Sequence, residues 1–290
     1  MKLMIGTAQF DRSYGIANKT GKMSREEIKE ILKLAAENKI EYLDTGNDYG
    51  NSERIIGEIS QELNTNFKVF TKLHFDFEKN SINDAKNEII KSVNKLNNKI
   101  SGLLIHNPKY LLTSKSDDIM SMLLNFKNSG TIKKIGVSAG TIDQVKNIIN
   151  KYSIDVVQLP TNILDQRFLQ SGLIDLMREK NIEIHIRSVF LQGLLLMKKE
   201  DMPKYFQELN LDLIYATIKE KNISMIKLAL EYAKSLNIDR IIIGIDNKNH
   251  LMSIIKEYNK SFDNDIDFNN FCTSDERFIN PANWNVGGWR

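Results

Sequence analysis

The chain has 290 residues, of which 41% are hydrophobic and 27% are charged, and only four are prolines. This composition is typical of a folded globular protein and argues against disorder. The 40 basic and 37 acidic residues leave a formal net charge of +3 without a long basic run, so the sequence lacks the electrostatic signature of a nucleic-acid-binding protein.

Eight short apolar runs, rich in β-branched residues, recur along the chain, and each precedes a polar turn and a segment of helical periodicity. In chain order the runs are KLMIG, IEYLD, KVFTK, SGLLIH, IKKIGVS, IDVVQL, IEIHIRSV and DRIIIGI. The helical segments are expected to begin near Ser24, Ser52, Ser81, Ser116, Thr141, Ser171, Ser224 and Asn247. Three of these starts have the spacing of a capping box, at Ser24 with Glu27, Ser81 with Asp84 and Thr141 with Gln144.

Strands that are apolar on both faces and alternate with helices predict a parallel sheet covered by helices. Eight such units favour a closed (β/α)8 TIM barrel over an open doubly wound sheet, because GTAQFDRSYG after the first strand is not the G-x-G-x-x-G turn. We expect one α/β domain over residues 1–290. Two additions to the repeat are predicted: an inserted segment after Ser188, helical from about Pro203 to Lys219, and a C-terminal extension from about Ser261 to Arg290.

The cysteine content and the first residues indicate the compartment. Cys272 is the only cysteine, which excludes an intrachain disulfide and a zinc site built from several cysteines. The stretch MKLMIGTAQF is well below a signal peptide or a membrane span. We therefore expect a cytoplasmic protein with no membrane or nucleic-acid partner and no metal, present as a monomer or a homodimer.

The barrel predicts where reactive side chains meet, because the C-terminal ends of its strands share one rim and barrel enzymes carry out their chemistry there. Asp44 ends the second strand, Lys72 the third and His106 the fourth. Tyr49 lies in the loop after the second strand, within DTGNDYGNSE. Each residue alone also fits an ordinary structural role, as a cap, a turn or a packing residue. Together, at one rim, they predict a catalytic site.

The chemistry of this group follows from pKa values. A phenol titrates near pH 10, and an ammonium within about 4–6 Å is expected to lower the pKa of Tyr49. Lys72 would be that ammonium and Asp44 its counter-charge, since an unpaired buried cation tends to lose its proton. Tyr49 would then protonate a carbonyl oxygen that His106 also hydrogen-bonds, and a cofactor would supply hydride. An alternative makes Lys72 the Schiff-base nucleophile of an aldolase-like barrel.

The wider pattern resembles the aldo-keto reductase family. The matching stretches, in family order, are MIGTAQF, YLDTGNDYGNSERIIGE, FTK, LLIHNP, IKKIGVSAG, DVVQLPTNILDQ, SVFLQGLL and IIIGIDNKNHL. Asp44, Tyr49, Lys72 and His106 fall on the family's catalytic tetrad without substitution. The resemblance implies that an NAD(P)H-dependent enzyme reduces an aldehyde or ketone, with Tyr49 as the general acid. A cofactor-binding regulatory module with little turnover is the alternative within the family.

The resemblance also implies a set of cofactor-binding residues. They are Gly6, Thr7, Asp44, Ser138, Gln158, Arg187, Ser188, Gln192, Gly193, Gly244, Asp246 and Lys248. Ser138 and Gln158 would hydrogen-bond the nicotinamide carboxamide, and the Arg187 guanidinium would stack on the nicotinamide ring. NADPH is the expected cofactor, and Lys248 could bind its phosphate. NADH is the alternative, because Asp246 suits a ribose hydroxyl better than a phosphate.

Two further stretches bear on the substrate. GTAQFDRSYGIAN and LQGLLL resemble bacterial members associated with sugar or surface-polysaccharide biosynthesis, which implies a sugar-derived carbonyl substrate. The tail FINPANWNVGGWR carries both tryptophans, Trp284 and Trp289, and C-terminal loops of the family commonly shape the substrate pocket. Docking of the tail onto the barrel through these rings is the alternative.

Overall fold

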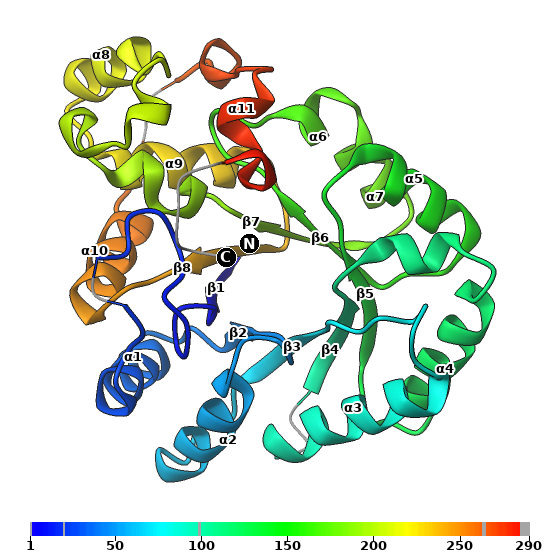
Figure 1. Ribbon diagram of the computed structural model, residues 1–290. Coiled ribbons are helices and arrows are strands. Elements are labelled where there is room, and N and C mark those ends of the chain that lie inside the picture. The colour runs from blue at the N-terminus through cyan, green and yellow to red at the C-terminus, as the bar shows by residue number, and fades with distance from the viewer. Residues whose placement is uncertain (1, 20, 98–99, 263–264, 285–290) are drawn as a thin grey trace.

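Eight parallel strands close into a barrel in the computed structural model, which describes residues 2–19, 21–97, 100–262 and 265–284 (Figure 1). The strands are β1 (Lys2–Gly6), β2 (Tyr42–Asp44), β3 (Lys68–Leu73), β4 (Ile100–Ile105), β5 (Lys134–Ser138), β6 (Val156–Pro160), β7 (Glu183–Arg187) and β8 (Arg240–Gly244). Each strand pairs with the next along the chain, and β8 pairs with β1. The predicted (β/α)8 barrel is confirmed.

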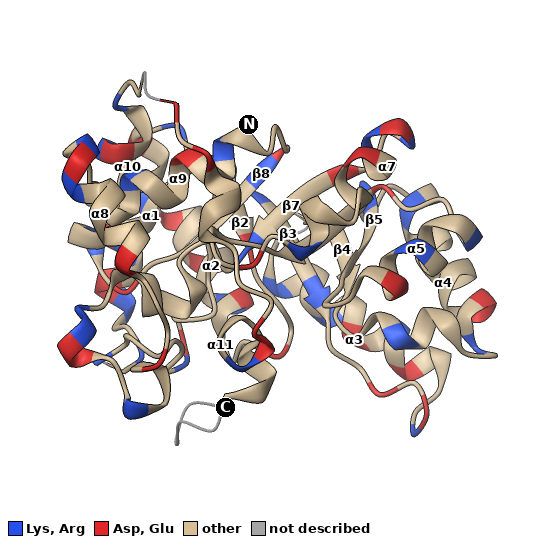
Figure 2. Cartoon of the chain, turned by 90° about the horizontal axis from the view of Figure 1, so that it is seen from above, with Lys and Arg blue, Asp and Glu red and all other residues tan. Residues whose placement is uncertain are grey.

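Helices surround the barrel (Figure 1). The α-helices are α1 (Arg25–Glu37), α2 (Ser52–Glu62), α3 (Ile82–Lys95), α4 (Ser116–Asn128), α5 (Ile142–Lys151), α6 (Arg167–Gln170), α7 (Leu173–Glu179), α8 (Asp212–Lys221), α9 (Met225–Ser235), α10 (Lys248–Asn259) and α11 (Glu276–Ile279). The 3-10 helices are η1 (Pro108–Leu112), η2 (Leu191–Leu196), η3 (Lys199–Asp201), η4 (Lys204–Phe206), η5 (Phe268–Phe271) and η6 (Pro281–Asn283). Basic and acidic residues alternate along the outer helices (Figure 2). Within the described residues, no helix combines the length and apolar character that a membrane crossing requires.

The helix starts follow the predicted caps closely. Two predicted capping boxes are present, at Ser24 with Glu27 and at Ser81 with Asp84. The third is half formed. Thr141 accepts the backbone N–H of Gln144, but the Gln144 side chain accepts from the N–H of Gly140 rather than from Thr141. The prediction of a complete box at Thr141 is therefore wrong, because the Gln144 side chain is engaged by the N–H of the preceding residue.

Two predicted helix boundaries need correction. No helix begins at Ser171: α6 ends just before it, and α7 begins after Gly172, which holds the left-handed φ of 71°. The predicted helix from Pro203 to Lys219 does not exist as one element, because α8 begins only at Asp212. There the Asn210 side chain accepts the N–H of Asp212 and sets the start of the helix. Hydrophobic periodicity alone does not locate such turns.

The inside of the barrel is filled by apolar side chains below its C-terminal rim. Met4, Phe70, Leu104, Val156 and Ile242, from five different strands, form a cluster separate from the core beneath the helices. They alternate along the strands with residues that face the helices. This apolar layer fills the interior of the barrel and leaves the C-terminal rim for a site.

Charged side chains lie at the lower, N-terminal end of the barrel. His185 is fully buried, its Nε2 lies 2.8 Å from Glu183, and its ring packs edge-on against Phe70 at 4.8 Å between centroids. Lys134 and Arg240 also pair with Glu183. Burial alone would raise the pKa of Glu183, but its hydrogen bonds lower that pKa to about 2.

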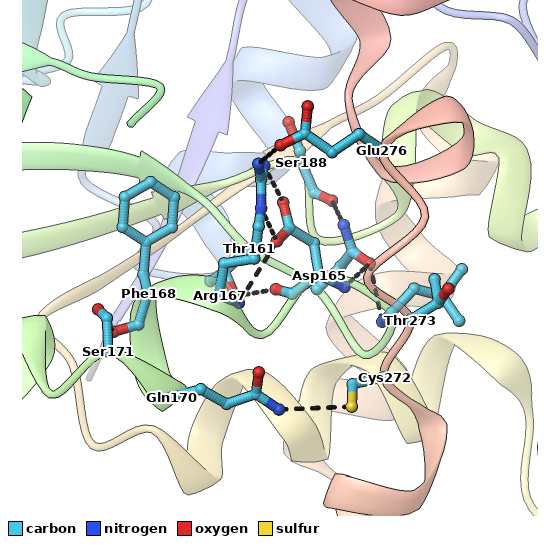
Figure 3. Close-up of polar contacts among 12 residues, drawn as sticks. Thr161, Asp165, Arg167, Phe168, Gln170, Ser171, Ser188, Cys272, Thr273 and Glu276 are labelled. Atoms are coloured by element: carbon cyan, nitrogen blue, oxygen red, sulfur yellow. Dashed lines mark hydrogen bonds and ion pairs between the residues drawn. The ribbon is translucent and has the colours of Figure 1, made fainter. Parts of the chain in front are cut away.

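The C-terminal extension is docked onto the barrel. The Arg167 guanidinium pairs with Asp165 at 2.8 Å and with Glu276 of α11 at 2.9 Å, so one arginine joins the loop after β6 to the tail (Figure 3). The Thr273 N–H donates to the Leu164 carbonyl nearby. These contacts hold the tail against the C-terminal rim.

The two tail tryptophans have different outcomes. Trp284 is 4% exposed, its Nε1 donates to the Phe278 carbonyl at 3.1 Å, and its ring packs edge-on against Phe206 of the insertion. Trp284 therefore docks the tail, as the second of the two interpretations expected. Trp289 lies outside the described residues.

Candidate active site

The ends of β2, β3 and β4 bring the four predicted catalytic side chains together. The Lys72 ammonium lies 2.5 Å from the Asp44 carboxylate, and the two side chains are 2% and 6% exposed. The same ammonium lies 5.1 Å from the centre of the Tyr49 ring. The rings of Tyr49 and His106 meet edge-on with centroids 6.4 Å apart. The four side chains therefore share one site.

The loop after β2 explains the residues that surround Tyr49. The Tyr49 N–H donates to the Gly46 carbonyl and closes a tight turn. Gly50 follows with a left-handed φ of 61°, and a Cβ there would lie 2.6 Å from the Asp11 carboxylate. That carboxylate accepts the Asn51 N–H at 2.8 Å. Asp11 thus ties the loop after β1 to the loop after β2, and only glycine leaves room for this contact.

Burial dominates the pKa of Tyr49. It raises the pKa of the phenol well above 10, and the charges of Asp44 and Asp48 raise it further. Arg187 and Arg12 act in the opposite direction but are outweighed. The expectation that the pKa of Tyr49 is lowered is therefore wrong for the protein without ligands. The phenol stays protonated at neutral pH, which is the form that donates a proton.

His106 is neutral at pH 7. Burial lowers the pKa of its imidazole to about 4, although Asp48 acts to raise it. A neutral imidazole carries one N–H donor and one acceptor nitrogen. The His106 backbone N–H donates to the Leu73 carbonyl, which anchors the backbone of this residue at the end of β4.

A partly open cavity lies beside Asp44 and Tyr49. Most of the predicted cofactor-binding residues line it: Gly6, Thr7, Asp44, Arg187, Ser188, Gln192, Gly193, Gly244 and Asp246. They come from the ends of β1, β2, β7 and β8 and from the loops that follow. The cavity therefore continues from the catalytic group across one half of the rim.

Three predicted cofactor-binding residues lie elsewhere. Gln158 is fully buried and donates from Nε2 to the Asp44 carboxylate at 2.7 Å. Ser138 donates in turn to the Gln158 side chain, so both hold Asp44 from behind. Lys248 lies outside the cavity, where its ammonium pairs with Glu30 at 2.7 Å.

Several lining residues were absent from the predicted set, notably Gln9, Tyr14, Phe190 and His250. Tyr14 lies in the loop after β1, and its hydroxyl accepts a hydrogen bond from Gln192 Nε2. His250 lies in the first turn of α10, with Nδ1 3.8 Å from the Asp246 carboxylate. The two residues lie eight and six positions after the ends of β1 and β8, so the rule of reading only the strand ends misses them.

The cavity wall fits an elongated polar ligand such as a nicotinamide dinucleotide. Gln192 Oε1 and His250 Nε2 are buried there without a hydrogen-bond partner, and buried polar atoms are normally paired. Among the described residues, the Arg187 guanidinium has no side-chain hydrogen bond or ion pair. These groups together offer an acceptor, a ring nitrogen and a cation to a bound molecule.

The family of the chain follows from its sequence as a whole. The model of the Aldo/keto reductase family matches residues 2–267. The chain belongs to the aldo-keto reductase family. It is an NAD(P)H-dependent oxidoreductase, and the family acts on small carbonyl substrates. No curated protein sequence matches the chain.

Solved structures share the fold of this aldo-keto reductase. An aldo-keto reductase from Bacillus halodurans in its holo form is 18% identical, covers 90% of this chain and 87% of its own, and superposes with a TM-score of 0.71. The glycerol dehydrogenase of Gluconobacter oxydans is 19% identical, with the same coverage and TM-score. At these identities the likeness concerns the fold alone.

Proposed function

We propose that this aldo-keto reductase reduces an aldehyde or ketone to an alcohol with Tyr49 as the general acid. The observation that carries the proposal is the protonated Tyr49 phenol beside the buried Asp44–Lys72 pair at the mouth of the cavity. NAD(P)H, when bound, supplies the hydride that forms the new C–H bond. The proton of the Tyr49 hydroxyl goes to the carbonyl oxygen.

The surrounding residues support the transfer of that proton. Proton donation leaves a phenolate, and a nearby cation stabilises that charge in a buried site. Lys72 is such a cation, and its own charge is held by Asp44. Asp44 is held in turn by the amide of Gln158. Neutral His106 would donate a hydrogen bond to the same substrate oxygen.

The end of β8 bears on the choice of cofactor. Asp246 lines the cavity, whereas Lys248 points away to Glu30. A carboxylate accepts a hydrogen bond from a ribose hydroxyl and repels a 2′-phosphate. NADPH is the usual cofactor of the family, but these positions favour NADH. Fluorescence titration checks this, and NADPH binding about tenfold tighter than NADH would reject it.

Kinetics of a tyrosine variant test the reaction itself. In Tyr49→Phe, kcat/KM for aldehyde reduction should fall by a factor of about 10²–10⁴, while the Kd of the reduced cofactor stays within about twofold. Tyr14→Phe is the matched control, since it removes a hydroxyl from the same cavity. If Tyr14→Phe lost activity while Tyr49→Phe stayed active, the assignment of the proton donor to Tyr49 would be wrong.

The two alternative functions are separated by simple assays. A regulatory module would bind NAD(P)H without oxidising it. A Schiff-base enzyme would be trapped by borohydride with substrate in the absence of nicotinamide. The buried ion pair with Asp44 argues against that chemistry, because it holds Lys72 in its charged, non-nucleophilic form.

The substrate class follows from the resemblance to sugar-associated bacterial members. We propose a sugar-derived carbonyl, and glyceraldehyde and aldose sugars are the first compounds to test. One structural neighbour is a glycerol dehydrogenase, which adds short polyols as test substrates for the reverse reaction. Cys272 is exposed and unpaired, which suits the cytoplasmic location that we also propose. Sedimentation would check the proposed monomer or homodimer.

A further inference from the structure

Three side chains beside the catalytic group form a cluster of metal-ligand type. Asp48, His74 and His106 each bring one nitrogen or oxygen atom to within 4.8 Å of the other two. His106 Nδ1 lies 3.6 Å from Asp48 Oδ1, and His74 Nδ1 lies 4.0 Å from Asp48 Oδ2. The two imidazole rings face each other edge-on at 5.4 Å between centroids. The cluster joins the loop after β2 to the residues that follow β3 and β4.

Two of the three ligand atoms lack a partner. Asp48 Oδ1 and His106 Nδ1 are both shielded from solvent, and neither makes a hydrogen bond within the part of the chain that the structure describes. Their separation of 3.6 Å is too long for a direct bond. Leaving a buried donor or acceptor unpaired costs about 1–3 kcal/mol. A polar group or ion placed between these two atoms would remove that cost for both.

The donor set suits a divalent transition ion. Zn²⁺ binds imidazole nitrogen and carboxylate oxygen at about 2.0–2.2 Å in a tetrahedral arrangement, so its ligand atoms lie roughly 3.3 Å apart. The separation of 3.6 Å between His106 Nδ1 and Asp48 Oδ1 is close to that value, whereas His74 Nδ1 lies 4.0 Å from the other carboxylate oxygen, Oδ2. The His74 side chain is 62% exposed and can rotate to close the remaining gap. Arg12, 3.9 Å from Asp48 and 46% exposed, can move aside into solvent.

We propose that Asp48, His74 and His106 form a Zn²⁺ site at the mouth of the catalytic cavity. Coordination through Nδ1 keeps His106 in the tautomer whose proton is on Nε2. Three protein ligands leave a fourth position for water or a substrate oxygen. The binding of Zn²⁺ does not depend on the proposed carbonyl reduction. Only the consequence of the His106 tautomer for catalysis rests on that proposed function.

Calorimetry on the purified enzyme, freed of any affinity tag, tests the site. The titrations use a Cys272→Ser background, because Cys272 is an exposed thiol that could bind zinc elsewhere. ZnCl₂ should bind at one site per chain. His74→Ala should weaken the affinity at least tenfold, and Asp48→Asn should do the same. Circular dichroism establishes that each variant is folded.

The matched control is His250→Gln. His250 lies on the same rim, 3.8 Å from Asp246, but the described residues supply no third ligand there. Its replacement should leave the Zn²⁺ affinity unchanged. Unchanged affinity in His74→Ala, or no binding to the parent protein, would overturn the proposal.

Nitrogen NMR of the histidine side chains gives a readout that does not use activity. Adding Zn²⁺ should shift Nδ1 of His74 and of His106 and leave His250 unaffected. Zinc binding without a shift at His106 would overturn the proposal. Because both measurements omit cofactor and substrate, their failure leaves the proposed carbonyl reduction untouched. Conversely, an inactive enzyme would not affect them.

Discussion

The ion pair between Lys72 and Asp44 permits a quantitative prediction. Its two side chains are 2% and 6% exposed and lie 2.5 Å apart. Removing one partner of a buried pair strands the other charge and typically costs about 3–5 kcal/mol of unfolding free energy. In Lys72→Met, Asp44 still accepts from Gln158 at 2.7 Å. We therefore expect a loss of about 3 kcal/mol, near the lower end of that range.

The double variant separates this charge effect from a simple loss of packing. Asp44→Asn alone should also cost about 3 kcal/mol, because it strands the buried ammonium. With both residues neutral no charge is stranded, so Lys72→Met with Asp44→Asn should cost at least about 2 kcal/mol less than the sum of the single variants. Urea unfolding, followed by circular dichroism and by tryptophan fluorescence, measures all four proteins.

A surface pair of the same chemistry provides the control. Lys68 and Glu41 lie 2.8 Å apart but are 46% and 48% exposed, so Lys68→Met should leave the unfolding midpoint unchanged. Additive costs for Lys72→Met and Asp44→Asn would refute the reasoning, because additivity means that neither charge depends on the other. An equal effect from Lys68→Met would refute the role of burial.

Three other predictions concern the cavity and the lower end of the barrel. In Gly193→Ala the new Cβ would lie 2.6 Å from the Ala17 Cβ, which would push the two loops over the cavity apart. The Kd of the cofactor should therefore rise. Gly21→Ala is the control for backbone strain, because Gly21 has a φ of 79° and open space around it. Although burial raises it, hydrogen bonds from its histidine and lysine partners lower the folded pKa of Glu183 to about 2 from 4.5. Its carboxylate therefore stabilises the fold above about pH 4.5 and loses this effect as the pH falls towards 2, so Glu183→Gln should cost about 2–3 kcal/mol at pH 7 and progressively less below pH 4.5, measured by urea unfolding against pH. Asp246→Ser should tighten NADPH binding about tenfold with little change for NADH, and an equal change for both would contradict repulsion of the phosphate.

The order of elements could be predicted because it depends on local chemistry. Buried strands of a parallel barrel are continuous apolar runs, and serine and threonine caps mark the helices between them. Both properties are visible in single segments such as KLMIG or the start at Ser24. The turn at Gly172 and the start of α8 at Asp212 could not be predicted, because the same hydrophobic periodicity continues across both positions.

The amino-acid order alone is enough to predict which reactive side chains lie at the strand ends. Asp44, Lys72 and His106 follow apolar runs, and the closure of the barrel makes such positions neighbours. Whether a phenol among them is acidic depends instead on how much water and which charges surround it. For Tyr49, burial and Asp44 outweigh the nearby cations. The pKa is a sum over groups from several strands, so it is decided only when all of them are placed.

The tertiary structure also decided which distant residues meet. Gln158 lies 114 positions from Asp44 yet donates to its carboxylate. Asp48, His74 and His106 form a cluster only because three loops converge above the barrel. No local pattern encodes such contacts, since each loop follows its own strand and the strands are brought together by closure of the sheet.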